Sequence, residues 1–184
     1  MSHSNILDSS DTVLIVIDVQ DALMKAIHER DRVAANTIRL IEAAKIFSIP
    51  ILVTLQYAER LGDCTRAIAD TLPHDDRIDK MTFSCCGEDL FLKALKETNR
   101  RRALLCGVES HVCVNQTAHD LLSLGYSVHL AKDAISSRTA ENWITGIEKM
   151  RDSGCVITST ETAIFELTKD ASSDAFKKIL PLVK

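Results

Sequence analysis

Three side chains of this 184-residue chain combine a residue type and a position that suit covalent chemistry. Cys113 follows a short polar loop and stands at the predicted start of a helix, where unpaired amides and the helix dipole favour a thiolate. Asp18 abruptly ends an apolar run, and a carboxylate withdrawn from water there is a candidate proton carrier. Lys80, if it faces the same cleft, adds a cation that favours the ionised thiol. The chemistry these types could perform together is nucleophilic attack on an acyl carbon.

Each of these residues also has a plain structural interpretation. Asp is a favoured helix N-cap, so Asp18 could simply cap the helix that follows it. Most lysines are solvated surface charges, and position alone does not distinguish Lys80 from them. Cysteines are often small core hydrophobes, which is the interpretation we give to Cys106 and Cys155. Cys113 differs from those two because it stands at a helix start, where thiol activation is easiest.

The elements that must position these residues follow from hydrophobic patterning. Short β-branched runs alternate with longer amphipathic stretches, which is typical of a parallel sheet covered by helices on both faces. Strands are predicted at 12–17, 51–55, near 78, and at 102–107, 126–130 and 155–158. Helices are predicted at 33–46, 90–95, 113–124, 140–151, 161–167 and 173–180. Residues 56–84 are less regular.

These elements predict one α/β domain spanning residues 1–184. Right-handed crossovers give a three-layer α/β/α, doubly wound, mainly parallel six-stranded sheet with the Rossmann-like order 3-2-1-4-5-6. Active groups of such sheets gather at the carboxyl ends of the strands. The sequence after Asp18 contains no glycine until Gly62, so a dinucleotide pyrophosphate is not expected at that strand end.

Composition limits the possible partners and location. Apolar residues make up 46% of the chain, charged residues 26%, and the net charge is −4, so nucleic acid is not an expected partner. No apolar run approaches the roughly 20 residues that span a bilayer, and no secretory signal is evident, so we expect a cytoplasmic protein without a membrane partner. The six cysteines have no zinc spacing and are expected to be reduced thiols.

Several motifs together resemble the isochorismatase-like cysteine hydrolase superfamily, and most closely its short isochorismatase domain-containing proteins. The run 12–20 (Thr-Val-Leu-Ile-Val-Ile-Asp-Val-Gln) resembles the family's opening, and Lys80 with Phe83-Ser84 is similar to its lysine segment. Residues 107–114 (Gly-Val-Glu-Ser-His-Val-Cys-Val) resemble its nucleophile loop. Further matches are 133–138 (Asp-Ala-Ile-Ser-Ser-Arg), 154–161 (Gly-Cys-Val-Ile-Thr-Ser-Thr-Glu) and the tail 176–179 (Phe-Lys-Lys-Ile). The matches cover nearly the whole chain in the family's order.

The resemblance implies a catalytic triad of Cys113, Asp18 and Lys80. It also implies a cis peptide bond between Val108 and Glu109, and an oxyanion hole formed by the backbone amides of Glu109 and Cys113. The expected activity is hydrolysis of a small amide-like (C–N) or other acyl substrate through a thioester on the cysteine. Cleavage of isochorismate itself breaks a vinyl ether, and some relatives that perform it lack this cysteine. Retention of Cys113 therefore favours an acyl substrate.

The sequence departs from the family's metal-binding members. Relatives that hydrolyse nicotinamide carry an Asp-x-His motif after the second strand, whereas residues 56–60 here read Gln-Tyr-Ala-Glu-Arg. We therefore expect no metal and no other cofactor. Relatives commonly form dimers or larger assemblies, so a homo-oligomer is expected.

Two other classes of function remain open. One is a redox-sensing protein that uses an activated Cys113, with Cys85 or Cys86 as a resolving thiol. The other is a non-catalytic oligomeric scaffold on the same fold, for which the joint presence of Asp18, Lys80 and Cys113 has no explanation.

Overall fold

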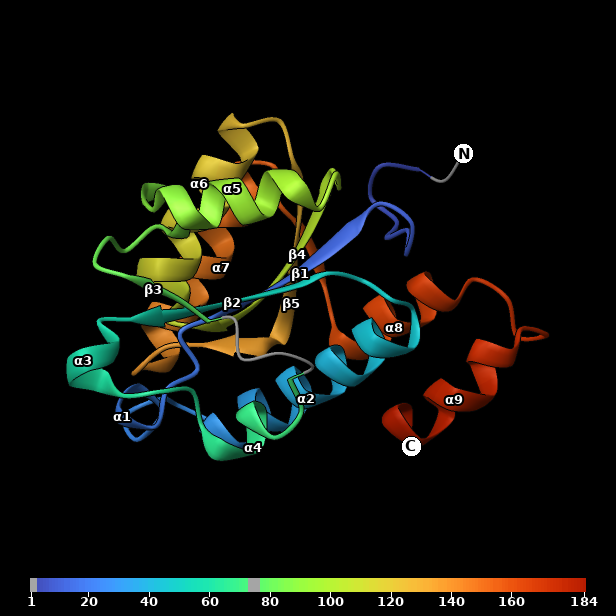
Figure 1. Cartoon of the computed structure of the whole chain (residues 1–184), viewed down its shortest axis with the longest axis horizontal. Coiled ribbons are helices and arrows are strands. Elements are labelled where there is room, and N and C mark those ends of the chain that lie inside the picture. The colour runs from blue at the N-terminus through green and yellow to red at the C-terminus, as the bar shows by residue number, and fades with distance from the viewer. Residues whose placement is uncertain (1–2, 73–76) are drawn as a thin grey trace.

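A computed structural model describes residues 3–72 and 77–184 of the chain and contains one six-stranded sheet. The strand order is β3-β2-β1-β4-β5-β6, and every neighbouring pair is parallel (Figure 1). The predicted doubly wound α/β fold and its order 3-2-1-4-5-6 are confirmed. The strands are β1 (Thr12–Ile17), β2 (Ile51–Gln56), β3 (Arg77–Lys80), β4 (Arg102–Val108), β5 (Ser127–Ser136) and β6 (Val156–Thr158).

Helices cover both faces of the sheet (Figure 1). One apolar cluster joins the sheet to α2 and α8, and a second joins the other face to α5, α6 and α7. The helices are α1 (Asp21–Met24), α2 (Arg30–Ile46), α3 (Ala58–Leu61), α4 (Arg66–Ala69), α5 (Asp89–Glu97), α6 (Asn115–Ser123), α7 (Ala140–Asp152), α8 (Thr160–Thr168) and α9 (Asp174–Val183). The 3-10 turn η1 (Cys85–Gly87) and the π-helical turn η2 (Ser110–Val114) complete them.

The central strand β1 shows why its sequence is continuously apolar. Successive side chains of a strand point to opposite faces, so Leu14 and Val16 enter one cluster while Val13, Ile15 and Ile17 enter the other. All six residues of β1 are buried. A strand enclosed on both faces needs an apolar run rather than alternation, and the prediction for 12–17 is confirmed.

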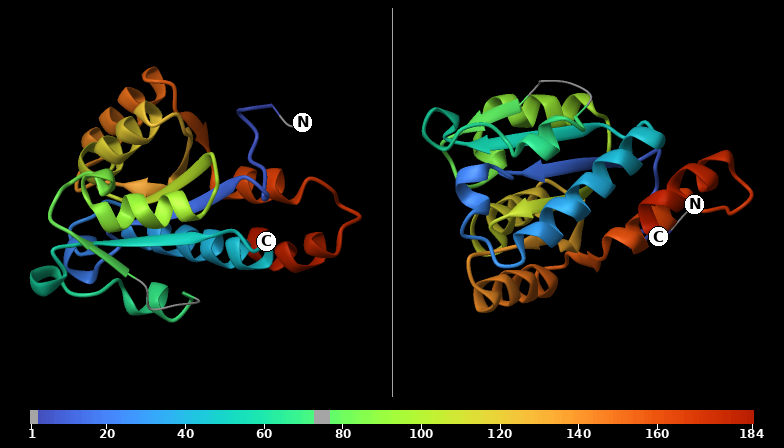
Figure 2. Two further views of the ribbon diagram at one scale, coloured as in Figure 1. Left: turned by 45° about the horizontal axis from the view of Figure 1, so that its top comes forward. Right: turned by 90° about the horizontal axis from the view of Figure 1, so that it is seen from below.

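The last two helices lie at one end of the molecule beside α2 (Figure 2). A small apolar cluster of Ala43, Ile164 and Ile179 joins α2, α8 and α9. Serine side chains begin both terminal helices: Ser159 accepts a hydrogen bond from the amide of Thr162, and Ser173 from that of Phe176.

The structure differs from the predicted elements in several places. The irregular segment contains the short helices α3 and α4, which carry too few turns to show a period. β5 runs to Ser136 instead of ending near 130, because its pairing with β4 shifts between Leu105 and Gly107 and then resumes. The helix that carries Cys113 begins with η2 at Ser110, three residues earlier than the predicted start, so Cys113 lies within its first turn.

Gly107 allows β4 to approach the end of β1. Its φ is +117°, and a Cβ atom added there would lie 2.0 Å from the backbone oxygen of Ile17. Ile17 pairs with Gly107 in the sheet and immediately precedes Asp18. A side chain at position 107 would therefore displace the strand end that presents the carboxylate.

Candidate active site

A fully enclosed ion pair joins the carboxyl ends of β1 and β3. Lys80 Nζ lies 2.7 Å from Asp18 Oδ2, and both side chains are 0% exposed. The other Asp18 oxygen, Oδ1, accepts a hydrogen bond of 2.8 Å from Thr54 Oγ1 on β2. Asp18 adopts a left-handed backbone conformation with φ of 54°, and its carbonyl accepts the Gln20 amide at 2.8 Å. This tight turn holds the carboxylate over the end of the sheet.

Oxygen atoms surround the Lys80 ammonium. Besides Asp18, it donates to Gln56 Oε1 at 2.6 Å and to the carbonyls of Thr82 and Phe83 at 3.2 Å. Burial opposes the charged form, but the negative charge of Asp18, and that of Cys113 when its sulfur is ionised, outweigh it, so the pKa of Lys80 is raised. The lysine therefore remains a cation inside the protein.

The Cys113 thiol lies beside this pair. Cys113 is 7% exposed, and its Sγ lies 3.9 Å from Gln56 Oε1. Burial, followed by the negative charge of Asp18, raises the pKa of the thiol to about 12, although Lys80 acts in the opposite direction. Burial and the carboxylate thus outweigh the cation, which by itself favours the thiolate. At neutral pH the sulfur carries its proton.

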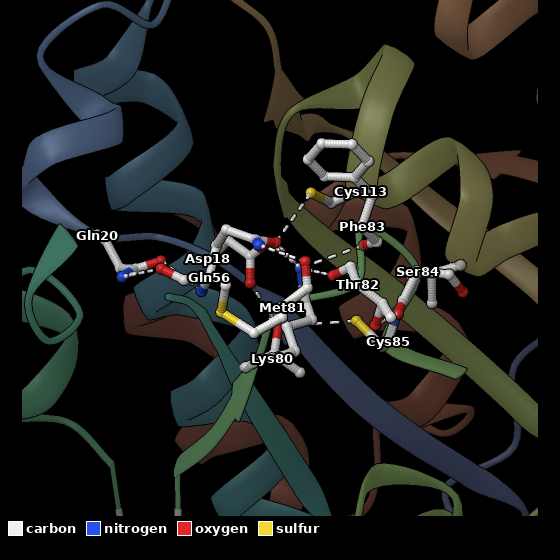
Figure 3. Close-up of polar contacts among 12 residues, drawn as sticks. Asp18, Gln20, Gln56, Lys80, Met81, Thr82, Phe83, Ser84, Cys85 and Cys113 are labelled. Carbon is white, nitrogen blue, oxygen red and sulfur yellow. Dashed lines mark hydrogen bonds and ion pairs between the residues drawn. The ribbon is translucent and has the colours of Figure 1, made fainter. Parts of the chain in front are cut away.

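Figure 3 shows the three predicted residues converging from separate parts of the chain. Asp18 comes from the end of β1, Lys80 from β3 and Cys113 from η2. The rule that strand ends meet at one edge of a parallel sheet predicted this convergence. The rule does not predict the protonation state of Cys113, because the pKa of a group depends on its surroundings.

Gln56 is a further site residue, which was not predicted. Its Oε1 accepts from Lys80 and faces the Cys113 sulfur, and its Nε2 donates to the Met81 carbonyl at 3.0 Å. Its backbone amide donates to Gln20 Oε1 at 2.8 Å, which fixes the strand end. Gln56 is the last residue of β2, next to β1 in the sheet. Its place at a strand end is the signal that could have indicated it.

The loop between β4 and η2 carries the other predicted groups. The Val108–Glu109 peptide bond is cis. Within residues 3–72 and 77–184 the backbone N–H of Glu109 donates to no acceptor. The Glu109 carboxylate accepts from Arg138, from its amide at 2.9 Å and from its Nε at 3.1 Å. His111, in the same loop, is hydrogen-bonded through Nδ1 to Ser137 Oγ at 3.0 Å.

A second buried thiol lies behind the ion pair. Cys85 is 0% exposed, and its Sγ lies 3.7 Å from Thr54 Oγ1, the hydroxyl that donates to Asp18. Burial, followed by the Asp18 charge, raises the pKa of Cys85 to about 11. Cys85 is therefore the more enclosed of the two thiols.

The donor atoms of the site do not form a metal-binding set. Lys80 is a cation at its centre, and in the described part of the chain no group of three or more His, Cys, Asp or Glu side chains could hold a metal ion. The absence of a metal and of other cofactors remains a prediction.

Comparison with protein families shows which family this chain belongs to. The isochorismatase domain model matches residues 12–162, which include Asp18, Lys80 and Cys113. This chain belongs to the isochorismatase family. It is a hydrolase of that family, as the resemblance implied. The family match does not specify a substrate.

Relatives of this isochorismatase-family protein are similar over almost their entire length. The secreted isochorismatase effector Isc1 of Phytophthora sojae is 40% identical over 177 residues, covering 94% of this chain and 84% of the relative. The zebrafish (Danio rerio) isochorismatase domain-containing protein 2 is 32% identical, covering 96% and 89%. A solved structure described as MAR1 ribonuclease from Caenorhabditis elegans superposes with a TM-score of 0.91 at 32% identity, covering 97% and 92%.

One more distant structure shares the fold alone. The YcaC gene product of Escherichia coli, described as an octameric hydrolase of unknown specificity, has a TM-score of 0.91 at 21% identity and covers 99% of this chain and 92% of its own.

The location of this family member remains a prediction. None of the described helices is long and apolar enough to cross a membrane. One relative is described as secreted, so family membership does not distinguish between compartments.

Proposed function

We propose that this protein is a cysteine-dependent hydrolase that cleaves a small amide-like (C–N) or other acyl substrate through a thioester on Cys113. The observation that supports it most is the enclosed Asp18–Lys80 pair, 2.7 Å apart, beside an almost buried thiol. A carboxylate and an ammonium are costly to bury, and such groups cluster where a protein needs them for chemistry. Cys113, Asp18 and Lys80 are the proposed catalytic residues.

The first half of the reaction forms the thioester. Because burial and Asp18 raise the pKa of Cys113 to about 12, the thiol loses its proton only as it attacks. Asp18 takes that proton, and the sulfur forms a bond to the carbonyl carbon. Lys80, which lies 2.7 Å from Asp18, stabilises the negative charge in the site, and Asp18 then passes the proton to the departing amine. The C–N bond breaks and an acyl-enzyme remains.

The second half returns the enzyme to its starting state. Asp18, again a carboxylate, removes a proton from water as the water oxygen attacks the thioester carbon. The carbon–sulfur bond breaks, the proton passes to the sulfur, and the carboxylic acid product leaves. No oxidant, metal or cofactor takes part in these steps.

The backbone amides of Glu109 and Cys113 form the proposed oxyanion hole. The unpartnered N–H of Glu109 supports this role, because it leaves a donor for the developing oxyanion. The Glu109 carboxylate accepts from Arg138. Removing one such donor costs on the order of 3 kcal/mol of transition-state stabilisation.

The redox-sensor alternative fits the site less well. Sensor cysteines are solvent-accessible thiols of low pKa. Cys113 is 7% exposed, and burial raises its pKa to about 12. Cys85 and Cys86, the suggested resolving thiols, also have pKa values raised by burial, to about 11 and about 12. A non-catalytic scaffold, in turn, has no use for an enclosed ion pair beside a thiol.

Nucleic acid is not the proposed substrate, although one relative is described as a ribonuclease. The chain has a net charge of −4, which gives no general attraction for phosphates. The proposed partners are a small-molecule substrate and further copies of the same chain, with no membrane partner.

The decisive experiment searches for the acyl-enzyme. Wild-type protein is mixed with a panel of amides, ureides and esters, quenched in acid, and its mass is measured intact and after digestion. We expect a mass increase equal to the acyl group on the Cys113 peptide. If no substrate class acylates Cys113, the proposal fails.

Two variants are matched controls for that experiment. Cys113→Ser should carry no thioester, whereas Cys86→Ser, which removes a half-buried thiol outside the ion pair, should acylate like the wild type. Single-stranded RNA incubated with the same preparations should stay intact. RNA cleavage that persists in Cys113→Ser would favour a phosphodiesterase over the proposed hydrolase.

A further inference from the structure

Two large apolar side chains are exposed on the loop that follows the lysine of the candidate active site. Met81 is 63% exposed and Phe83 is 54% exposed. Single exposed apolar residues are common on protein surfaces. These two differ because they flank Thr82, whose carbonyl accepts a hydrogen bond from the Lys80 ammonium. Their exposure therefore belongs to the surroundings of the reacting groups.

Hydrogen bonds fix the backbone of this loop, so the exposure does not result from loose packing. Lys80 donates to the carbonyls of Thr82 and Phe83, both at 3.2 Å. Glu88 Oε1 accepts from the Met81 amide at 3.1 Å and from the Thr82 hydroxyl at 3.2 Å. The fold thus presents two apolar side chains to solvent in defined positions.

The Phe83 ring points away from Lys80, to the side of the site where the Cys113 sulfur lies (Figure 3). The Phe83 carbonyl and Gln56 Oε1 accept from the same Lys80 ammonium, at 3.2 and 2.6 Å. Gln56 Oε1 in turn lies 3.9 Å from Cys113 Sγ. The ring therefore borders the space from which a substrate carbonyl would reach the sulfur.

The Lys80 ammonium has no proton left for a substrate. A lysine side chain has three N–H bonds and no acceptor. Four oxygen atoms within 3.2 Å already surround these donors: Asp18 Oδ2, Gln56 Oε1 and the carbonyls of Thr82 and Phe83. The cation can stabilise negative charge in the site, but it does not select an anionic substrate through a hydrogen bond of its own.

We propose that the substrate of the Cys113 site is apolar next to its reacting carbonyl, and that Phe83 is the residue that selects it. The inference rests on the proposed hydrolase in taking Cys113 as the reacting atom. An apolar part of the substrate would cover the exposed ring and release water from both surfaces. Burial of an aromatic ring is strong enough to favour one ligand over another by about tenfold. Small-molecule sites commonly combine such apolar walls with a few polar groups.

The test measures alkylation of Cys113, which requires no hydrolysis. Iodoacetamide and N-benzyl-2-iodoacetamide react through the same carbon and differ by one apolar group. Their rates at the Cys113 peptide are measured by mass spectrometry at one pH, and each is divided by the rate of that reagent with free cysteine. We expect the benzyl reagent to be about tenfold faster after this correction.

Variants then assign the preference to the ring. Phe83→Ala should reduce it to about twofold or less, because the apolar contact is lost. Phe83→Leu, which keeps an apolar side chain, should retain at least about threefold and guards against a variant that fails to fold. Phe165→Ala on α8 is the matched control, because Phe165 is also exposed (40%), and it should keep the full preference. Circular dichroism checks that each variant is folded.

The outcomes separate this inference from the proposed hydrolase. If the benzyl preference depends on Phe83 but no substrate ever acylates Cys113, the hydrolase proposal fails and the apolar selection stands. The inference is overturned if the two reagents react equally, or if Phe83→Ala and Phe165→Ala have the same effect. It is also overturned if Phe83→Ala changes only the mass of the assembly measured by light scattering, which would assign the ring to a contact between copies of the chain.

Discussion

The Asp18 carboxylate and the Lys80 ammonium lie 2.7 Å apart, and neither side chain has any exposure to solvent. Removal of both charges from water is unfavourable, and their mutual attraction repays it only while both are present. Each residue also has a second strong partner: Thr54 donates to Asp18, and Gln56 accepts from Lys80. Each residue therefore stabilises the other in the interior, and together they form the centre of the candidate active site.

Replacing both members of this pair should cost less stability than the two single replacements added together. Asp18→Asn and Lys80→Met are each expected to lower the free energy of unfolding by about 3–5 kcal/mol, because each leaves a buried polar group or charge without its partner. The double variant should lose less than the sum of the two. Urea unfolding followed by circular dichroism measures all three.

An exposed ion pair is the control for that comparison. Arg66 and Asp70 lie 3.6 Å apart with side chains 93% and 69% exposed, so Arg66→Gln should leave the unfolding midpoint unchanged. Simple addition of the two single losses in the Asp18/Lys80 double variant would show that the residues are not coupled.

The reactivity of Cys113 should rise with pH well beyond neutrality. Its pKa is raised to about 12, by burial first and then by Asp18, so the thiolate fraction should increase about tenfold per pH unit from pH 7 to 10. Alkylation by iodoacetamide, followed on the Cys113 peptide by mass spectrometry, measures this. A plateau near pH 8 would contradict the raised pKa.

Removing the carboxylate should then separate reactivity from catalysis. Asp18→Asn takes away a charge that raises the pKa of Cys113, so alkylation at pH 8 should become faster. Hydrolysis should nevertheless be lost, because the proton acceptor is gone. Faster alkylation together with lost turnover is not what a merely structural role of Asp18 would give.

A charge introduced at position 56 should change the pKa of the Cys113 thiol. Its Oε1 lies 3.9 Å from the sulfur, so Gln56→Glu places a second carboxylate beside the thiol and should raise its pKa further. We expect alkylation at pH 8 to slow about tenfold, equivalent to one pKa unit. Gln116→Glu, an exposed position on α6, is the matched control and should alkylate at the wild-type rate. Equal rates in both variants would remove Gln56 from the site.

Gly107→Ala should destabilise the protein more than another glycine of similar backbone conformation. The new Cβ would meet the Ile17 oxygen at 2.0 Å, so β1 and β4 must separate, and we expect a loss of more than about 3 kcal/mol in unfolding free energy. Gly125 has a φ of +83° but nothing within 4 Å of an added Cβ. Gly125→Ala should therefore cost only about 1 kcal/mol, from backbone conformation alone. Equal losses would show that the contact with Ile17 is unimportant.

The strands were largely predictable because burial on both faces leaves a direct mark in the sequence. The run 12–17 is apolar since β1 contacts helices on each side, and its pattern required no knowledge of neighbours. The short helices α3 and α4 were not predicted, because four residues are too few to show a helical repeat of apolar side chains. The full length of β5 was also missed, since the shifted pairing at Gly107 depends on β4.

The sequence by itself determined the sheet, its order and the strand end that carries Asp18, because local hydrophobic patterning and the handedness of crossovers contain that information. The resemblance of its motifs to a known family joined Lys80 and Cys113 to Asp18 as one site. Only the tertiary structure decided that the thiol is protonated and that Gln56 is its neighbour. Only it showed that Phe83 stays exposed while its carbonyl binds Lys80. Protonation and side-chain contact depend on desolvation and charge summed over residues distant in the chain, and no local pattern records that sum.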